Sequence, residues 1–144
     1  MQDRRHRLVL DTNVLVAALR SRRGWSFQLL TQLGTGAFDP VLTVPLVMEY
    51  EDVLLRPGLV PLAPSAVGDI LDFLCSSGLR QTVHFLWRPR LNDVKDDLLL
   101  EAAVNGQCQT IVTWNIRDFR PAAAFGIQVT SPDKFLNPRP ESTP

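Results

Sequence analysis

The strongest constraint on this chain is a run of apolar residues that leads directly into an acid, in the sequence Leu8-Val9-Leu10-Asp11-Thr12-Asn13. Three consecutive apolar side chains are typical of a strand that is buried on both faces of a parallel sheet. The residues from Val14 to Leu19 then have the pattern of a helix, and Asp, Thr and Asn favour the turn before a helix. Asp11 is therefore expected at the carboxyl end of a central strand, where open α/β sheets place their binding sites.

Two interpretations of Asp11 follow from this position. A carboxylate beside an apolar core costs free energy unless a positive group pairs with it. Asp11 either caps the helix and does nothing more, or it belongs to a site that holds a cation. The segment alone does not decide between them, so the decision depends on the acids elsewhere in the chain.

Short apolar runs alternate with helical patterns along the rest of the sequence. The further strands are expected at Val41–Val44, Gln81–Leu86, Thr110–Thr113 and Gly126–Val129. The further helices are expected at Trp25–Leu33, Leu46–Leu55, Ser65–Ser77 and Lys95–Gly106. This alternation predicts a three-layer α/β/α fold around a central, mostly parallel sheet of about five strands. We expect a single domain over residues 1–136 and a disordered, proline-rich tail over residues 137–144.

The composition excludes several classes of protein. The 144 residues have the size of one domain, and no apolar run approaches the ~18 residues of a membrane span. Asp11 interrupts the apolar run behind the basic N-terminus, which is unlike a signal peptide, so we expect a cytoplasmic protein without membrane contact. The net charge of zero gives no general attraction to nucleic acids. Two histidines and two isolated cysteines do not make a zinc site, so oxygen atoms would have to hold any metal.

Three further segments carry more acids than their helices or strands need. Glu49 falls between Leu46 and Val53 on the inward face of its helix, where an unpaired carboxylate is unusual, and the alternative explanation is that it pairs with a nearby arginine. Two acids stand in the first turn of the helix Lys95–Gly106, where one would suffice to answer the helix dipole. The fourth acid follows the strand Thr110–Thr113, as Asp11 follows the first strand. These residues are Glu49, Asp96, Asp97 and Asp118.

Asp11, Glu49, Asp97 and Asp118 can converge, because the carboxyl ends of parallel strands meet at one edge of a sheet. Several carboxylates in one place repel each other and raise each other's pKa values, and a divalent cation removes this conflict. Oxygen ligands without His or Cys suit Mg²⁺ or Mn²⁺. Such a cluster typically performs metal-assisted hydrolysis of phosphodiester bonds.

The acids lie in four sequence pieces that resemble, in content and order, those of the PIN domain, the nuclease fold of VapC-type toxins in bacterial toxin–antitoxin pairs. The resemblance extends from about Leu8 to Phe135. The pieces are Val9–Val14, Glu49 with Val53–Pro57, Asp96–Ala103, and Ile111–Asn115 with Asp118 and Phe119.

The resemblance implies a role for each matching residue. Asp11, Glu49 and Asp97 correspond to the three central metal-binding acids, and Asp118 to a more variable fourth. Asp97 takes this role rather than Asp96, because it stands directly before the apolar part of its helix. The resemblance also implies supporting polar groups, a homodimer, an RNA substrate, and an antitoxin protein that blocks the site. The supporting groups are Thr12, Asn13, Asp96, Thr113 and Asn115, the last of which is Asp in many relatives, so a second metal would be held less tightly.

The leading hypothesis is a Mg²⁺- or Mn²⁺-dependent endoribonuclease, the toxin of a toxin–antitoxin pair. A phosphohydrolase that uses Asp11 as a covalent nucleophile would need a second Asp at position 13, where this chain has Asn13. A non-catalytic PIN module that binds RNA or a protein would be favoured by the loss of a central acid, and none is missing. Arginines after the first helix and beside the fourth acid are candidates for RNA contacts, namely Arg20, Arg22, Arg23, Arg117 and Arg120.

Overall fold

The computed structural model describes residues 6–33, 35–83 and 94–138, and it contains a five-stranded parallel sheet of strand order β3-β2-β1-β4-β5. The strands are β1 (His6–Leu10), β2 (Phe38–Leu42), β3 (Leu79–Arg80), β4 (Thr110–Val112) and β5 (Gln128–Thr130). The α-helices are α1 (Thr12–Arg20), α2 (Trp25–Gln32), α3 (Val44–Leu54), α4 (Pro64–Ser77), α5 (Val94–Asn105) and α6 (Pro132–Leu136). A 3₁₀ segment, η1 (Ile116–Phe125), joins β4 to β5. The predicted parallel α/β architecture is confirmed.

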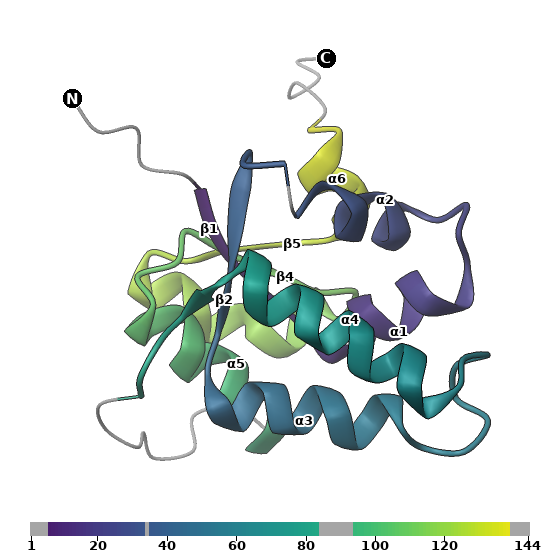
Figure 1. Cartoon of the computed structure of the whole chain (residues 1–144). Coiled ribbons are helices and arrows are strands. Elements are labelled where there is room, and N and C mark those ends of the chain that lie inside the picture. Colours follow the sequence, from purple (N-terminus) through teal and green to yellow (C-terminus); the bar gives the residue numbers. More distant parts are fainter. Residues whose placement is uncertain (1–5, 34, 84–93, 139–144) are drawn as a thin grey trace.

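The helices form two layers around the sheet (Figure 1). From β1 the chain moves along the sheet to β2 and β3, and then crosses back past β1 to β4 and β5. Right-handed crossovers that move in opposite directions along a sheet place their helices on opposite faces of it. Accordingly α1 packs against α2 and α3, and α3 packs against α4, whereas α5 contacts β1, β2 and β4 and also packs against η1. None of the helices in the described parts of the chain is long and apolar enough to cross a membrane.

The centre of the sheet is β1, and its carboxyl end is fixed from two sides. Leu8, Val9 and Leu10 are buried, with Leu10 paired to Val112 of β4. The hydroxyl of Tyr50 on α3 donates a hydrogen bond to the carbonyl of Leu10, which ties α3 to the same point. The backbone therefore holds the end of β1, the end of β4 and the middle of α3 together, and this positions the candidate site.

Two strands differ most from the sequence prediction, and capping explains the first difference. The strand predicted at Val41–Val44 lies at Phe38–Leu42 instead. Thr43 leaves the sheet because its side-chain hydroxyl accepts a hydrogen bond from the backbone amide of Leu46, at 3.2 Å, and so begins α3.

The strand predicted at Gln81–Leu86 is wrong for the residues that the structure describes, because β3 covers only Leu79 and Arg80. Gly78 explains this early start. A side-chain carbon at position 78 would lie 2.5 Å from the carbonyl oxygen of Pro40, so only glycine lets the chain approach β2 there. Residues 84–86 of that prediction lie outside the described residues, as do residues 139–144 of the predicted tail.

Candidate active site

Four acids from separate parts of the chain line one cavity of about 170 Å³ at the carboxyl edge of the sheet. The acids are Asp11 after β1, Glu49 on α3, Asp96 in the first turn of α5, and Asp118 in η1. Polar side chains from the same segments complete the lining, together with one apolar residue from each of two helices. These are Thr12, Asn13, Asn115, Leu46 and Leu99.

Asp11 is the most constrained acid of this cavity. Its carboxylate is 8% exposed, and its Oδ2 accepts a hydrogen bond of 2.7 Å from the hydroxyl of Thr113. Burial raises the pKa of Asp11, while the Thr113 hydrogen bond and the nearby amides of Asn13 and Thr12 oppose this effect and the charge of Asp118 adds to it. Asp11 occupies the N-cap position of α1 but makes no side-chain capping hydrogen bond. Asp11 therefore interacts with the end of β4 as well as with the start of its own helix.

Hydrogen bonds from the loop after β4 set the orientation of Asp11 and its neighbours. Thr113 Oγ1 accepts the amide of Asn115 at 2.9 Å, so its own proton is directed to Asp11. Asn13 Oδ1 accepts the amide of Trp114 at 3.3 Å. Of the predicted supporting groups, Thr12 and Asn13 line the cavity at its α1 side. Thr113 is not among the lining residues and contacts Asp11 through its hydrogen bond.

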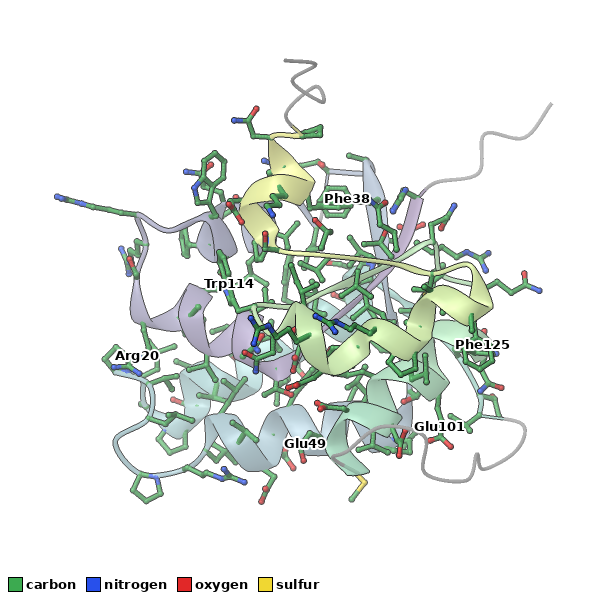
Figure 2. The ribbon with its side chains drawn as sticks, turned by 180° about the vertical axis from the view of Figure 1, so that it is seen from behind. Arg20, Phe38, Glu49, Glu101, Trp114 and Phe125 are labelled. Carbon is green, nitrogen blue, oxygen red and sulfur yellow. The ribbon has the colours of Figure 1, made fainter. Side chains whose placement is uncertain are left out.

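Glu49 reaches the cavity from α3 and is half-buried, as expected from its place on the inward side of the helix (Figure 2). The next residue, Tyr50, is fully buried and holds the helix against Leu10. Burial raises the pKa of Tyr50 well above its usual value, so this residue stays a neutral hydrogen-bond donor. Sequence reasoning took Tyr50 only as part of the apolar face and missed its anchoring role.

The first turn of α5 presents Asp96 to the cavity, whereas Asp97 is buried and is not among the lining residues. Consecutive residues of an α-helix point about 100° apart, so both cannot face the same cavity. This placement differs from the expectation that Asp97 takes the central role. Leu99, three residues after Asp96, lies on the same side of α5 and lines the cavity too.

Asp118 and Asn115 form the open side of the cavity, and both are exposed. They belong to the loop and 3₁₀ segment after β4, which the sequence did not predict as helical. Non-helical dihedral angles at Phe119 bend this segment, and Phe119 is fully buried. The buried ring thus anchors the turn that carries Asp118.

The donor atoms around the cavity fit a hard divalent cation, because all are carboxylate, amide or hydroxyl oxygens. Four carboxylates around about 170 Å³, with the pKa of Asp11 raised by burial, also create a need for positive charge. Within the described residues, no three acidic, histidine or cysteine side chains form a group that could hold an ion as they stand. The acids would therefore have to turn inward around a cation.

The five arginines proposed for RNA contacts are exposed, and none lines the cavity. Arg20 ends α1 at one side of the molecule, opposite the side that carries Phe125 (Figure 2). Arg22 and Arg23 follow in the loop to α2, and Arg117 and Arg120 lie in η1.

Comparisons with known proteins give a family and a structural relative. The model of the PIN domain matches residues 7–117, which include Asp11, Glu49 and Asp96 but end one residue before Asp118. A chain of the crystal structure of VapBC2 from Rickettsia felis, bound to a DNA fragment from their promoter, has the same fold with a TM-score of 0.60 and 15% identity, over 85% of this chain and 96% of that one. No curated protein matches. The family model covers more than half of the sequence, and the chain therefore belongs to the PIN domain family.

Proposed function

We propose that this protein is a metal-dependent endoribonuclease and the toxin of a toxin–antitoxin pair. PIN domains are generally nucleases. The observation that carries the proposal is the cavity at the carboxyl edge of the sheet, where Asp11, Glu49, Asp96 and Asp118 come together from four parts of the chain. A cluster of acids is a poor site for a polyanion such as RNA unless cations intervene, so the proposal includes Mg²⁺ or Mn²⁺.

Asp11, Glu49 and Asp96 would hold the ion, with Asp118 at the open side. When bound, such a cation activates a water molecule and offsets the charge on the phosphate. The assignment of Asp97 to this set remains a prediction from the family resemblance, and the lining of the cavity supports Asp96 instead. Asn115 in place of an acid leaves less negative charge at the open side, which favours one tightly held ion over two.

Thr113 and Asn13 would act through the acids and the loop that they position. The hydrogen bond from Thr113 keeps the carboxylate of Asp11 oriented and favours its ionised form. Asn13 holds the loop after β4 through the amide of Trp114, and that loop carries Asn115 and leads to Asp118. Both groups resemble the outer-sphere partners that orient metal ligands in other proteins.

The proposal also includes a toxin role, an antitoxin partner and a homodimer. The support is the PIN family membership together with the fold shared with a chain of the VapBC2 complex. Production of the protein in a bacterial host should arrest growth, and Asp11→Asn should relieve the arrest. Unimpaired growth with intact, RNA-cleaving protein would remove the toxin role and leave the nuclease.

A PIN module that binds RNA or a protein without catalysis is the second candidate. One observation favours it, because the described acids do not form a ready three-ligand group. It predicts RNA binding of equal strength with metal and with EDTA, and no RNA cleavage under any metal condition.

The direct test is hydrolysis of a mixed RNA pool by the purified protein, with Mg²⁺ or Mn²⁺ and with or without EDTA. Asp11→Asn keeps the size of the side chain and its capping ability but removes the charge, so it separates a cation site from a helix cap. We expect cleavage by the wild type with metal and none by the variant. The matched control is Asp52→Asn, an exposed acid on α3 that pairs only locally with Arg56.

Wild-type cleavage that persists in EDTA would overturn the metal dependence. Cleavage by Asp11→Asn at the wild-type rate would overturn the site. Inactivity of a folded wild type, together with metal-independent RNA binding, would establish the second candidate instead.

A further inference from the structure

Trp114 is held in place by hydrogen bonds although much of its side chain is exposed. It lies in the loop after β4, between Thr113 and Asn115, and is 41% exposed. Its indole Nε1 donates a hydrogen bond of 2.9 Å to Ser26 Oγ on α2, and its backbone amide donates to Asn13. The only polar hydrogen of the ring is thus satisfied inside the protein, so the exposed part of the ring offers apolar π surface.

A second cavity, of about 740 Å³, opens beside this loop. Trp25 and Ile116 form apolar walls, and Gln128, Thr130, Asp133 and Lys134 contribute polar groups. The volume lies within the ~300–1,000 Å³ of typical ligand sites. The mixture of flat apolar walls and polar edges is the composition that suits an aromatic ring with hydrogen-bonding edges.

Residues close to Trp114 in the chain line each of the two cavities. Asn115 lines the acid cavity, and the next residue, Ile116, lines the second one. On the other side, Ser26 holds the indole of Trp114, and its neighbour Trp25 lines the second cavity. Trp114 is therefore linked to residues of both cavities, through its chain neighbour Asn115 and through Ser26, and Figure 2 labels its side chain in the view from behind.

The distribution of charged side chains indicates different positions for the bases and for the phosphates of a bound RNA strand. The second cavity has one carboxylate, Asp133, and one ammonium group, Lys134, which gives it no excess of positive charge. Exposed arginines lie next to two of its lining residues in the chain, with Arg22 and Arg23 just before Trp25 and Arg117 just after Ile116. Phosphates would follow these arginines, and uncharged aromatic rings would enter the cavity.

We propose that Trp114 and the cavity between Trp25 and Ile116 form a base-stacking subsite for single-stranded RNA. This inference rests on the proposed nuclease function and adds how the strand is oriented. A phosphate at the acid cavity places a neighbouring base against the exposed ring of Trp114, and the following base enters the second cavity. The subsite selects unpaired RNA, because a base within a duplex has no free face to stack on an aromatic ring.

Binding of fluorescent oligoriboadenylate, 12 nucleotides long, to the full chain in EDTA tests the subsite without cleavage. Trp114→Ala should weaken binding about tenfold, and Trp114→Phe should retain most of the affinity because it keeps an aromatic face. An oligonucleotide of the same length with abasic sites should bind the wild type about tenfold more weakly, and Trp114→Ala should cause no further loss with this probe. Phe73→Ala, which removes an aromatic side chain of similar exposure on α4, is the matched control.

The salt dependence separates stacking from charge. Trp114→Ala should leave the slope of binding against salt concentration unchanged, since no phosphate contact is lost. Ser26→Ala removes the hydrogen bond to the indole but leaves the Trp114 side chain itself intact. It should therefore cause a smaller loss of RNA affinity than Trp114→Ala. Melting curves for each variant show whether the fold persists.

Equal loss with the normal and the abasic probe would overturn the subsite, since it would indicate a structural role for Trp114. Unchanged RNA binding by Trp114→Ala would also overturn it and would leave the exposed ring to a protein partner. Either result is independent of the nuclease proposal, because cleavage of RNA by the wild type with metal is measured separately. A wild type that binds the oligonucleotide but never cleaves would confirm the subsite and refute the nuclease.

Discussion

Strands β1 and β4 are neighbours in the sheet, and each runs from buried apolar residues into polar ones at the same edge. After β1 the acid, Asp11, is buried and receives a hydrogen bond from Thr113. After β4 the corresponding residues, Asn115 and Asp118, are exposed and belong to a loop and a 3₁₀ segment. A similar sequence pattern thus gives a desolvated charge at one strand end and a hydrated charge at the other.

The difference indicates which acid depends most on a cation. A buried carboxylate gains most from a bound cation, because water no longer stabilises its charge. An exposed carboxylate gains less, because water already stabilises its charge. We therefore expect substitutions around Asp11 to have large effects and substitutions of the outer charges to have small ones.

The largest effect is expected for Asp11→Asn. Partners outside the metal ligands typically contribute about 10–100-fold, so removal of a central ligand should lower the cleavage rate by more than about 100-fold. Without metal, the same substitution should raise the melting temperature by roughly 2–8 °C, because it removes a buried charge. Cleavage rates and melting curves check both; a lower melting temperature would contradict the account of Asp11 as a desolvated charge.

The pH dependence of stability sharpens this prediction. Burial raises the pKa of Asp11, so the folded metal-free protein binds this proton more tightly than the unfolded chain does. As the pH rises from the ordinary to the raised pKa, ionisation of Asp11 progressively destabilises the fold, and the full cost is present above the raised pKa. Unfolding at several pH values in EDTA should show this component in the wild type and not in Asp11→Asn.

The next largest effect on cleavage is expected at one of the two acids at the start of α5. Asp96→Asn should lower cleavage by more than about 10-fold, whereas Asp97→Asn should affect cleavage less, because only Asp96 lines the cavity. Cleavage rates of both variants at saturating Mn²⁺ show which of the two acids contributes more to cleavage. The reverse order of effects would restore Asp97 to the role that the family resemblance implies.

Thr113→Val tests the link between the two strand ends. The substitution keeps the shape of the side chain but removes the donor to Asp11 and the acceptor for Asn115. It should destabilise the fold by about 1.5–3 kcal/mol and raise the pKa of Asp11 further, which moves the acidic limb of the cleavage profile to higher pH. An unchanged pH profile would show that Thr113 does not control the ionisation of Asp11.

The smallest effect is expected at the outer arginines. Replacement of Arg20, Arg22 and Arg23 by glutamine should weaken RNA binding and reduce the salt slope by up to about 2, since each phosphate contact with a single strand contributes ~0.7. Filter binding at several salt concentrations measures the slope. The same slope in the triple variant and the wild type would exclude this loop as a phosphate site.

The sequence was sufficient for the architecture because strand and helix signals here are local. The apolar run at Leu8–Leu10 predicts the central strand, and the inward place of Glu49 on its helix predicts that it reaches the interior. Both depend on periodicity within one segment. The parallel order of the strands then follows from their alternation with helices.

Features set by contacts between distant segments were not predictable in the same way. The start of β3 depends on the close approach of Gly78 to Pro40, and the choice between Asp96 and Asp97 depends on how α5 is rotated against the sheet. The exposure of Trp114 depends on its hydrogen bond to Ser26, 88 residues earlier in the chain. Each of these is a tertiary relation that no local pattern encodes.

The most direct test of the central claim is a calorimetric titration of Mn²⁺ into the wild-type protein and into Asp11→Asn, with Asp52→Asn as the control. The account predicts saturable binding by the wild type and by the control, with proton release that increases at lower pH, where more of Asp11 is protonated before the metal binds. It predicts a loss of that binding in Asp11→Asn. Equal Mn²⁺ binding by Asp11→Asn and the wild type, or no saturable binding by a folded wild type, would contradict the claim that these acids form a cation site.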